Sequence, residues 1–161
     1  MTELQEHARV VIVGAGIVGC SVAYHLTKLG WRDIVVVEQG PLFETGGSTS
    51  HAPGLIFQIN SSKTMTGFAK YTTELFRSLE LDGETCGRAV GSLEVAWTPE
   101  RLSDLRRKIG TGMAYGVEAH LLDPREARDK VPMLSEKILG AMYTPRMSIR
   151  APSARPRQWP A

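Results

Sequence analysis

Three glycines and one glutamate have the spacing of a dinucleotide-binding site. Gly14, Gly16 and Gly19 form a G-x-G-x-x-G turn directly after the apolar run RVVIV at residues 9–13. The first glycine permits a tight turn, the second lets the backbone approach a pyrophosphate, and the third lets a helix pack on a strand. Glu38 follows 19 residues after Gly19. A carboxylate at that place binds the hydroxyls of an adenosine ribose and repels a 2′-phosphate, so the pattern predicts FAD or NAD and not NADP.

A second segment, GGSTSHAPG at residues 46–54, sets a histidine among small residues. Such a segment has no side chains with which to build a core, and it lets a ligand approach the backbone closely. The neutral imidazole of His51 is a competent nucleophile near neutral pH. The residue types alone leave two interpretations open, an ordinary loop hydrogen bond and a bond to the ligand.

The elements that must position these residues follow a strand, helix, strand order. Residues 9–13 and the run DIVVVEQG at 33–40 are apolar without alternation, as expected of strands that are buried on both faces. Between them, CSVAYHLTKLG at 20–30 has helical spacing and a glycine stop. This order predicts a right-handed βαβ unit with two parallel strands.

Beyond residue 60 the pattern changes to longer helices and short strands. The sequence predicts a first helix that is capped by Ser61 or Ser62 and whose apolar face consists of Met65, Phe68, Ala69, Leu75, Phe76 and Leu79. A strand at 90–97 follows, and then a helix that starts at Thr98-Pro99 and has Arg106-Arg107-Lys108 in solvent. The last elements are a short helix from Asp123 to the Pro132 region and a strand at 138–144.

The composition is that of an ordinary globular chain. Its 161 residues are 42% hydrophobic and 22% charged, enough for one domain. Four of the 19 Lys+Arg fall in residues 146–161, where no acid occurs, so the remainder is slightly acidic and predicts neither nucleic-acid nor membrane binding. Cys20 and Cys86 lack metal-ligand spacing, so we expect reduced thiols and no metal site. Without a signal-peptide pattern at the start, we expect a cytoplasmic protein.

Beyond the glycine turn, the chain resembles a known family. The segments RVVIVGAGIVG, EQGPLFETGGSTSHAPG, SSKTMTGFAKYT and VGSLEVA are similar to the N-terminal part of the dimethylglycine oxidase and sarcosine dehydrogenase family, over about Arg9 to Pro145. The resemblance implies an incomplete α/β fold: a Rossmann-like βαβ FAD-binding domain of the D-amino-acid-oxidase and glutathione-reductase type, with the start of an α+β substrate domain. It also implies an FAD-dependent enzyme that oxidises a secondary or tertiary N-methylated amine, such as dimethylglycine or sarcosine, by hydride transfer to flavin N5.

The same resemblance gives His51 a role. In that family the histidine of this loop bonds covalently to the 8α-methyl carbon of the flavin, so the chain is expected to be a covalent flavoprotein. The cofactor-binding residues expected on all these grounds are Gly14, Ala15, Gly16, Ile17, Val18, Gly19, Glu38, Gln39, Gly47, Ser48, Thr49 and His51. Catalytic residues over the flavin are expected beyond this chain, and the electron acceptor is either oxygen or an electron-transfer partner.

The segment RMSIRAPSARPRQWPA at residues 146–161 departs from the family pattern. Its prolines at 152, 156 and 160 exclude helix and strand, and it is interpreted as a disordered or out-of-frame tail. We therefore expect a flavin-binding unit with its loop at 1–60, helices and strands leading into the substrate domain at 61–145, and this tail. The missing C-terminal part of the same polypeptide would complete the fold. Two alternatives are an NAD-binding Rossmann module of a dehydrogenase and an inactive truncated product.

Overall fold

The chain divides into two compact units after Pro53. The computed structural model describes residues 7–41, 46–81, 83–146 and 148–150. The division falls earlier than the boundary after residue 60 that the sequence suggests, because the short strand that follows Pro53 pairs within the second unit. Each unit is described by itself.

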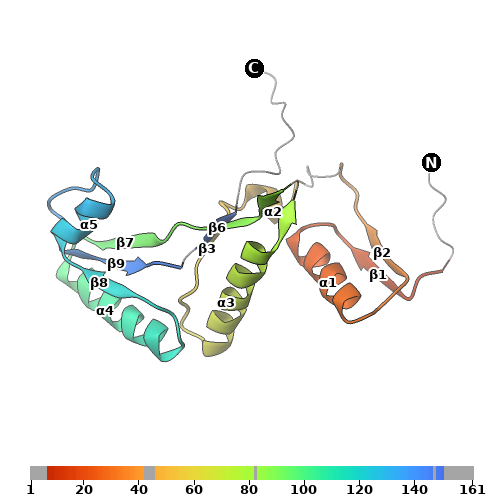
Figure 1. Ribbon diagram of the computed structural model, residues 1–161, viewed down its shortest axis with the longest axis horizontal. Helices are drawn as coiled ribbons and strands as arrows, with labels where there is room; N and C mark the ends of the chain where they lie inside the picture. Colours follow the sequence, from red (N-terminus) through yellow and green to blue (C-terminus); the bar gives the residue numbers. More distant parts are fainter. Residues whose placement is uncertain (1–6, 42–45, 82, 147, 151–161) are drawn as a thin grey trace, which may run out of the picture. The chain divides into compact units, whose positions relative to one another are not determined.

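The first unit is a βαβ unit with a short extra helix. Its elements are β1 (Val10–Val13), α1 (Ile17–Lys28), β2 (Ile34–Val37) and α2 (Ser48–His51). The two strands are parallel, with Val10 opposite Ile34 and Val13 opposite Val37, and α1 packs along them (Figure 1). The parallel βαβ arrangement expected from the sequence is confirmed.

The expected burial of both strand faces is wrong for this unit. Exposure alternates along β1, and Val11 and Val13 leave 58% and 85% of their surface in solvent. The reason is that α1 covers one face of the pair, and no other described element of the unit covers the second. A buried parallel sheet needs helices on both faces.

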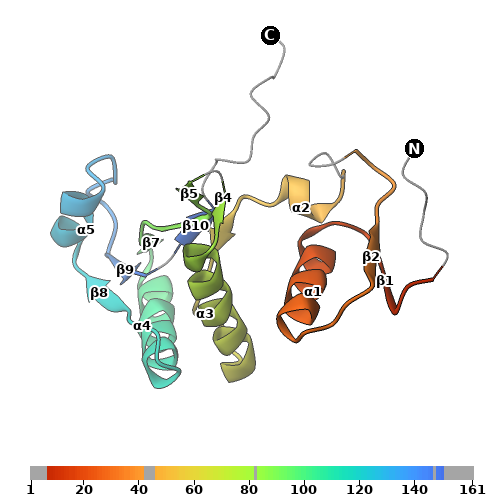
Figure 2. The same ribbon diagram turned by 45° about the vertical axis from the view of Figure 1, so that its right-hand side comes forward.

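The second unit is built from antiparallel strands and three helices. Its elements are β3 (Leu55–Ile56), α3 (Lys63–Ser78), β4 (Glu80–Leu81), β5 (Glu84–Thr85), β6 (Gly87–Ala89), β7 (Ser92–Ala96), α4 (Pro99–Ala114), β8 (His120–Leu122), α5 (Pro124–Lys130), β9 (Gly140–Thr144) and β10 (Ser148–Arg150). The strands form sheets in the orders β3-β10-β6 and β7-β9-β8, with β4 and β5 as a separate pair. Figure 2 shows α3 and α4 side by side, and Lys70 Nζ of α3 donates to the Tyr115 carbonyl at the end of α4 over 3.5 Å.

The three expected helix starts of this unit are confirmed. Ser62 accepts the N–H of Met65 at the start of α3, and Thr98 accepts the N–H of Arg101 at the start of α4. Asp123 forms a complete capping box with Glu126 at the start of α5. These side chains satisfy N–H groups that a helix leaves free in its first turn.

The core of this unit lies between α4 and the β7-β9-β8 sheet. Leu105 of α4 is fully buried, together with Ala96 of β7 and Met142 of β9. By contrast, Met65 and Phe68 on the expected apolar face of α3 are exposed. An apolar residue at helical spacing is buried only if another element lies over it, which spacing alone does not reveal.

Two further expectations need correction. Lys108 is not simply in solvent, because its side chain is two-thirds buried and its Nζ lies 2.6 Å from Oε2 of Glu94 on β7.

The prediction that no strand forms beyond Arg146 is wrong for residues 148–150, which form β10 between β3 and β6. These three residues precede the first proline of the segment, at 152, so nothing prevents their pairing. Residues 151–161 lie outside the described part, and their out-of-frame origin stays a prediction.

Candidate functional site: a dinucleotide cleft in the first unit

The glycine turn between β1 and α1 is close-packed. Gly14 has a φ of +98°, and its N–H donates to the Val37 carbonyl over 2.7 Å. A Cβ atom at Gly19 would lie 1.9 Å from the Gly14 carbonyl oxygen, so α1 can begin here only with a glycine at that place. The turn brings the positive dipole end of α1, and the N–H groups of its first turn that have no partner within the helix, to the carboxyl ends of both strands.

Glu38 ties the end of β2 to this turn. Its Oε2 accepts the N–H of Ala15 over 2.7 Å, and its Oε1 accepts the N–H groups of Gln39 and Gly40 over 2.9 and 3.0 Å. The pKa of Glu38 lies below its ordinary value, because the N–H groups of Gly40, then Ala15, and to a lesser extent Gln39 stabilise the carboxylate. Desolvation of the carboxylate opposes this lowering. The carboxylate is therefore ionised at neutral pH, which favours ribose hydroxyls over a 2′-phosphate.

The short helix α2 carries the histidine. Gly47 precedes it, and its carbonyl oxygen accepts hydrogen bonds from Ser50 Oγ over 2.8 Å and from His51 Nδ1 over 3.0 Å. Thr49 points to the glycine turn, and its Oγ1 accepts the N–H of Ile17, the first residue of α1, over 2.9 Å. This short turn therefore contacts the imidazole through the Gly47 carbonyl and the start of α1 through the Thr49 hydroxyl.

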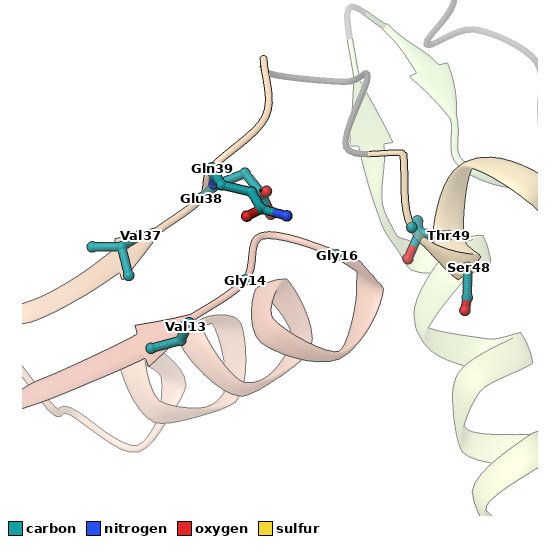
Figure 3. A pocket seen from close by; sticks show the side chains of 9 residues that line it. Val13, Gly14, Gly16, Val37, Glu38, Gln39, Ser48 and Thr49 are labelled. Carbon is teal, nitrogen blue, oxygen red and sulfur yellow. Dashed lines mark hydrogen bonds between the residues drawn. The ribbon is translucent and has the colours of Figure 1, made fainter.

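A cleft of about 600 Å³ opens at this junction (Figure 3). It is lined by Val13, Gly14, Gly16, Val37, Glu38, Gln39, Gly47, Ser48 and Thr49. Figure 3 shows Glu38 and Gln39 over the glycine turn, with Thr49 beside the first turn of α1. Backbone N–H groups, two hydroxyls and one carboxylate thus surround a space whose floor is glycine, an arrangement suited to a phosphate-bearing ligand.

Most of the expected cofactor residues meet at this cleft, and a few do not. Ala15 and Ile17 contribute through their backbone N–H groups. Gly19 packs below the turn, Val18 faces solvent, and His51 lies on α2 just outside the lining. The contact of each with a cofactor stays a prediction.

Sequence reasoning missed two lining residues and one contact. Val13 and Val37 line the cleft as the last residues of β1 and β2, a place that the parallel pairing could have indicated. The hydrogen bond from the Ile17 N–H to Thr49 joins residues 32 positions apart, and no local sequence pattern predicts it.

The comparisons with known proteins define the class. Residues 9–154 match the model of the DAO family, described as FAD dependent oxidoreductase, and the chain belongs to that family. FAD is the cofactor that this membership implies, which decides between FAD and NAD where the glycine turn alone could not. The site fits FAD: the glycine floor leaves room for a pyrophosphate, and three N–H groups occupy about three of the four lone-pair sites of Glu38, leaving one for a ribose hydroxyl.

Several curated proteins are similar over most of the chain. It is 37% identical to a mouse mitochondrial pyruvate dehydrogenase phosphatase regulatory subunit over 145 residues, 88% of this chain and 16% of that protein. It is 35% identical to human mitochondrial sarcosine dehydrogenase over 147 residues, again 88% and 16%, and 34% identical to rat mitochondrial dimethylglycine dehydrogenase over 146 residues, 89% and 17%. The chain thus spans about one sixth of the length of these relatives.

Solved structures of FAD-dependent oxidoreductases superpose on this chain. L-proline dehydrogenase from P. horikoshii superposes with a TM-score of 0.79 at 25% identity, over 91% of this chain and 39% of that one. Glycine oxidase from Geobacillus kaustophilus gives 0.75 at 27% identity, over 88% and 40%. The fold is therefore that of FAD-dependent oxidoreductases of the DAO type, of which this chain presents a part. Among the described residues, no helix has the length and apolar character needed to span a bilayer.

Proposed function

We propose that this chain is the flavin-binding part of an oxidoreductase that oxidises N-methylated amines, and that it holds FAD covalently through His51. The observation that carries the proposal is the position of His51 on a short turn whose Ser48 and Thr49 line the dinucleotide cleft, as does Gly47 before them. Two of the relatives are named for sarcosine and dimethylglycine, both N-methylated amino acids. The shared chemistry of these names supports an N-methyl amine as substrate.

The hydrogen bonds of His51 select one ring nitrogen for the bond to flavin. A carbonyl oxygen only accepts, so the 3.0 Å contact with Gly47 places the proton on Nδ1. Nε2 then carries the lone pair, and it has no hydrogen-bond partner among the described residues. In the neutral tautomer that this bond selects, Nε2 is the ring nitrogen available as a nucleophile.

The remaining residues bind and orient. The N-terminus of α1 and the hydroxyls of Ser48 and Thr49 would hold the pyrophosphate, and Glu38 would hold the adenosine ribose. When bound, FAD supplies the acceptor for the hydride that leaves the N-methyl carbon. In this proposal the substrate pocket belongs to chain outside the 161 residues, since the chain covers about one sixth of the length of its enzyme relatives. The electron acceptor is oxygen or an electron-transfer partner.

The covalent bond is tested by incubating the purified chain with FAD, denaturing it, and measuring its intact mass and in-gel flavin fluorescence. We expect one FAD to survive denaturation in the native sequence and none in His51→Ala. His120→Ala, a change to an exposed histidine of the second unit, should attach flavin as the native chain does. Attachment in His51→Ala would place the bond elsewhere and refute the role of His51.

The substrate is tested with the flavoprotein isolated from its native host. Under exclusion of oxygen, sarcosine and dimethylglycine should bleach the flavin absorbance, whereas glycine, which lacks the N-methyl group, should not. Bleaching by glycine at an equal rate would contradict an N-methyl carbon as the hydride donor.

A second candidate function is regulatory. It is favoured by the similarity to a phosphatase regulatory subunit, which is as close as that to the dehydrogenases. A flavoprotein that keeps FAD but is bleached by none of these amines would support it.

A further inference from the structure

The hydroxyl of Thr49 joins the two parts of the proposed flavin site. Thr49 belongs to α2, two residues before His51, whereas Ile17 opens α1 directly after the glycine turn. The 2.9 Å hydrogen bond from the Ile17 N–H to Thr49 Oγ1 links these two elements. The other polar side-chain contacts of α2 reach Gly47 or join Ser50 to His51, so they shape the turn without fixing its place.

Gly16 is adapted to this contact. A Cβ atom on Gly16 would lie 3.1 Å from Thr49 Oγ1, closer than most such contacts. Any larger residue at this position would push Thr49 away from the start of α1. Gly16 therefore serves the approach of Thr49 in addition to that of a pyrophosphate.

The bond also gives α1 a cap from a distant segment. The residue before α1 is Gly16, which has no side chain to cap the helix. The first N–H of the helix, that of Ile17, is satisfied by Thr49 instead, 32 positions further along the chain. The hydroxyl thereby stabilises the start of α1 and, at the same time, anchors the turn that carries the imidazole.

We propose that Thr49 is a positioning residue for flavin attachment: its hydroxyl holds the His51 turn against the N-terminus of α1, so that the imidazole stands beside the cofactor cleft. This inference rests on the proposed covalent bond to His51. In the attachment, a C–H bond of the 8α-methyl group breaks and a bond from that carbon to Nε2 forms. Two electrons and two protons leave, one proton from the methyl carbon and one from the imidazole, and dioxygen takes them up as hydrogen peroxide.

The consequence is a separation of binding from bond formation. The glycine turn, Ser48 and Glu38 also bind FAD, so the Thr49 hydroxyl is one of several binding contacts. The reaction, by contrast, needs Nε2 within bonding reach of one carbon atom. A displacement of about 1 Å can slow such a step on the order of 100-fold. Loss of the hydroxyl should therefore slow attachment far more than it weakens FAD binding.

The test compares Thr49→Val, which keeps the shape and loses the acceptor, with Thr49→Ser, which keeps the acceptor. At saturating FAD and in air, we expect the rate constant of covalent attachment to fall roughly 10- to 100-fold in Thr49→Val and to recover in Thr49→Ser. The FAD affinity, measured for each variant in a His51→Ala background, should fall less than about tenfold. Thr27→Val, which removes a hydroxyl at the other end of α1, should attach flavin as the native chain does.

Amide hydrogen exchange gives a readout that does not need the cofactor. The Ile17 N–H should exchange at least about tenfold faster in Thr49→Val than in the native chain or Thr49→Ser. Equal attachment rates in the native chain and Thr49→Val overturn the positioning role and leave the covalent bond standing. Failure of the native chain to attach FAD overturns the proposed bond, and the positioning role with it, whatever the exchange rates.

Discussion

The backbone N–H of Ala15 donates to Oε2 of Glu38 over 2.7 Å, although 23 positions separate the two residues. The contact closes the glycine turn over the end of β2. Because the N–H groups of Gly40, Ala15 and Gln39 lower the pKa of Glu38, the folded chain holds this carboxylate ionised more firmly than the unfolded chain does.

Glu38→Gln is therefore expected to change the acid response of the first unit. A depressed pKa in the folded state contributes stability above 4.5, the ordinary value, and this contribution is lost as the pH falls through the lowered value. Urea midpoints measured from neutral to acid pH should fall for the native chain and fall less for Glu38→Gln. The same variant should bind FAD more weakly, since an amide is a poorer acceptor for a ribose hydroxyl. Glu74→Gln, at an exposed position on α3, is the control and should change neither the pH dependence of the urea midpoint nor FAD binding.

Gly19→Ala is expected to disrupt the first unit. The new Cβ would lie 1.9 Å from the Gly14 carbonyl oxygen, a backbone atom that cannot move aside without opening the turn. We expect a destabilisation of roughly 3 kcal/mol and loss of FAD binding. Gly67→Ala in α3, where a Cβ meets nothing within 4 Å, should instead stabilise its helix by about 1 kcal/mol. Normal FAD binding by Gly19→Ala would contradict the close packing of the turn.

The ion pairs of Glu94 are expected to matter more than those on the open surface. Glu94 on β7 is three-quarters buried and binds both Lys108 and Arg101 of α4. Glu94→Gln removes the anionic partner of Lys108 and one of the two partners of Arg101, which keeps its pair with Asp104. It should cost about 1–2 kcal/mol in urea unfolding, less at high salt. Glu84→Gln breaks an exposed pair with Arg88 and should cost less than about 0.5 kcal/mol. Equal effects of the two substitutions would show that burial does not strengthen the Glu94 pairs.

Ser148→Ala is expected to leave the second unit as stable as before or more stable. The Ser148 side chain on β10 is fully buried, and its Oγ has no hydrogen-bond partner in the described structure. Removing a buried, unpaired hydroxyl relieves a desolvation cost of about 1–3 kcal/mol and leaves only a small void. A loss of more than about 1 kcal/mol in thermal unfolding would show that the hydroxyl has a hydrogen-bond partner, such as a buried water.

The sequence predicts the local features well and the distant ones poorly. The glycine turn, the strand pair and the caps at Ser62, Thr98 and Asp123 are determined by residues close together in the chain, so their patterns are visible. The bonds Ile17–Thr49 and Glu94–Lys108 depend on how separate elements meet. Strands of two or three residues, such as β3 and β10, are too short to show an alternation of apolar and polar residues. They form only because they pair with neighbouring strands.

The uncovered face of the β1–β2 pair has a consequence for the fate of the chain in solution. In the described part, the two strands pair only with each other, so each has one edge of unpaired N–H and C=O groups beside exposed valines. The segments VVIV and IVVV contain neither charge nor proline, the gatekeepers that normally prevent edge-to-edge stacking. A molecule in which nothing covers this sheet is therefore a template for cross-β aggregation. The yield of folded protein will depend on how soon other strands pair with the edges of β1 and β2.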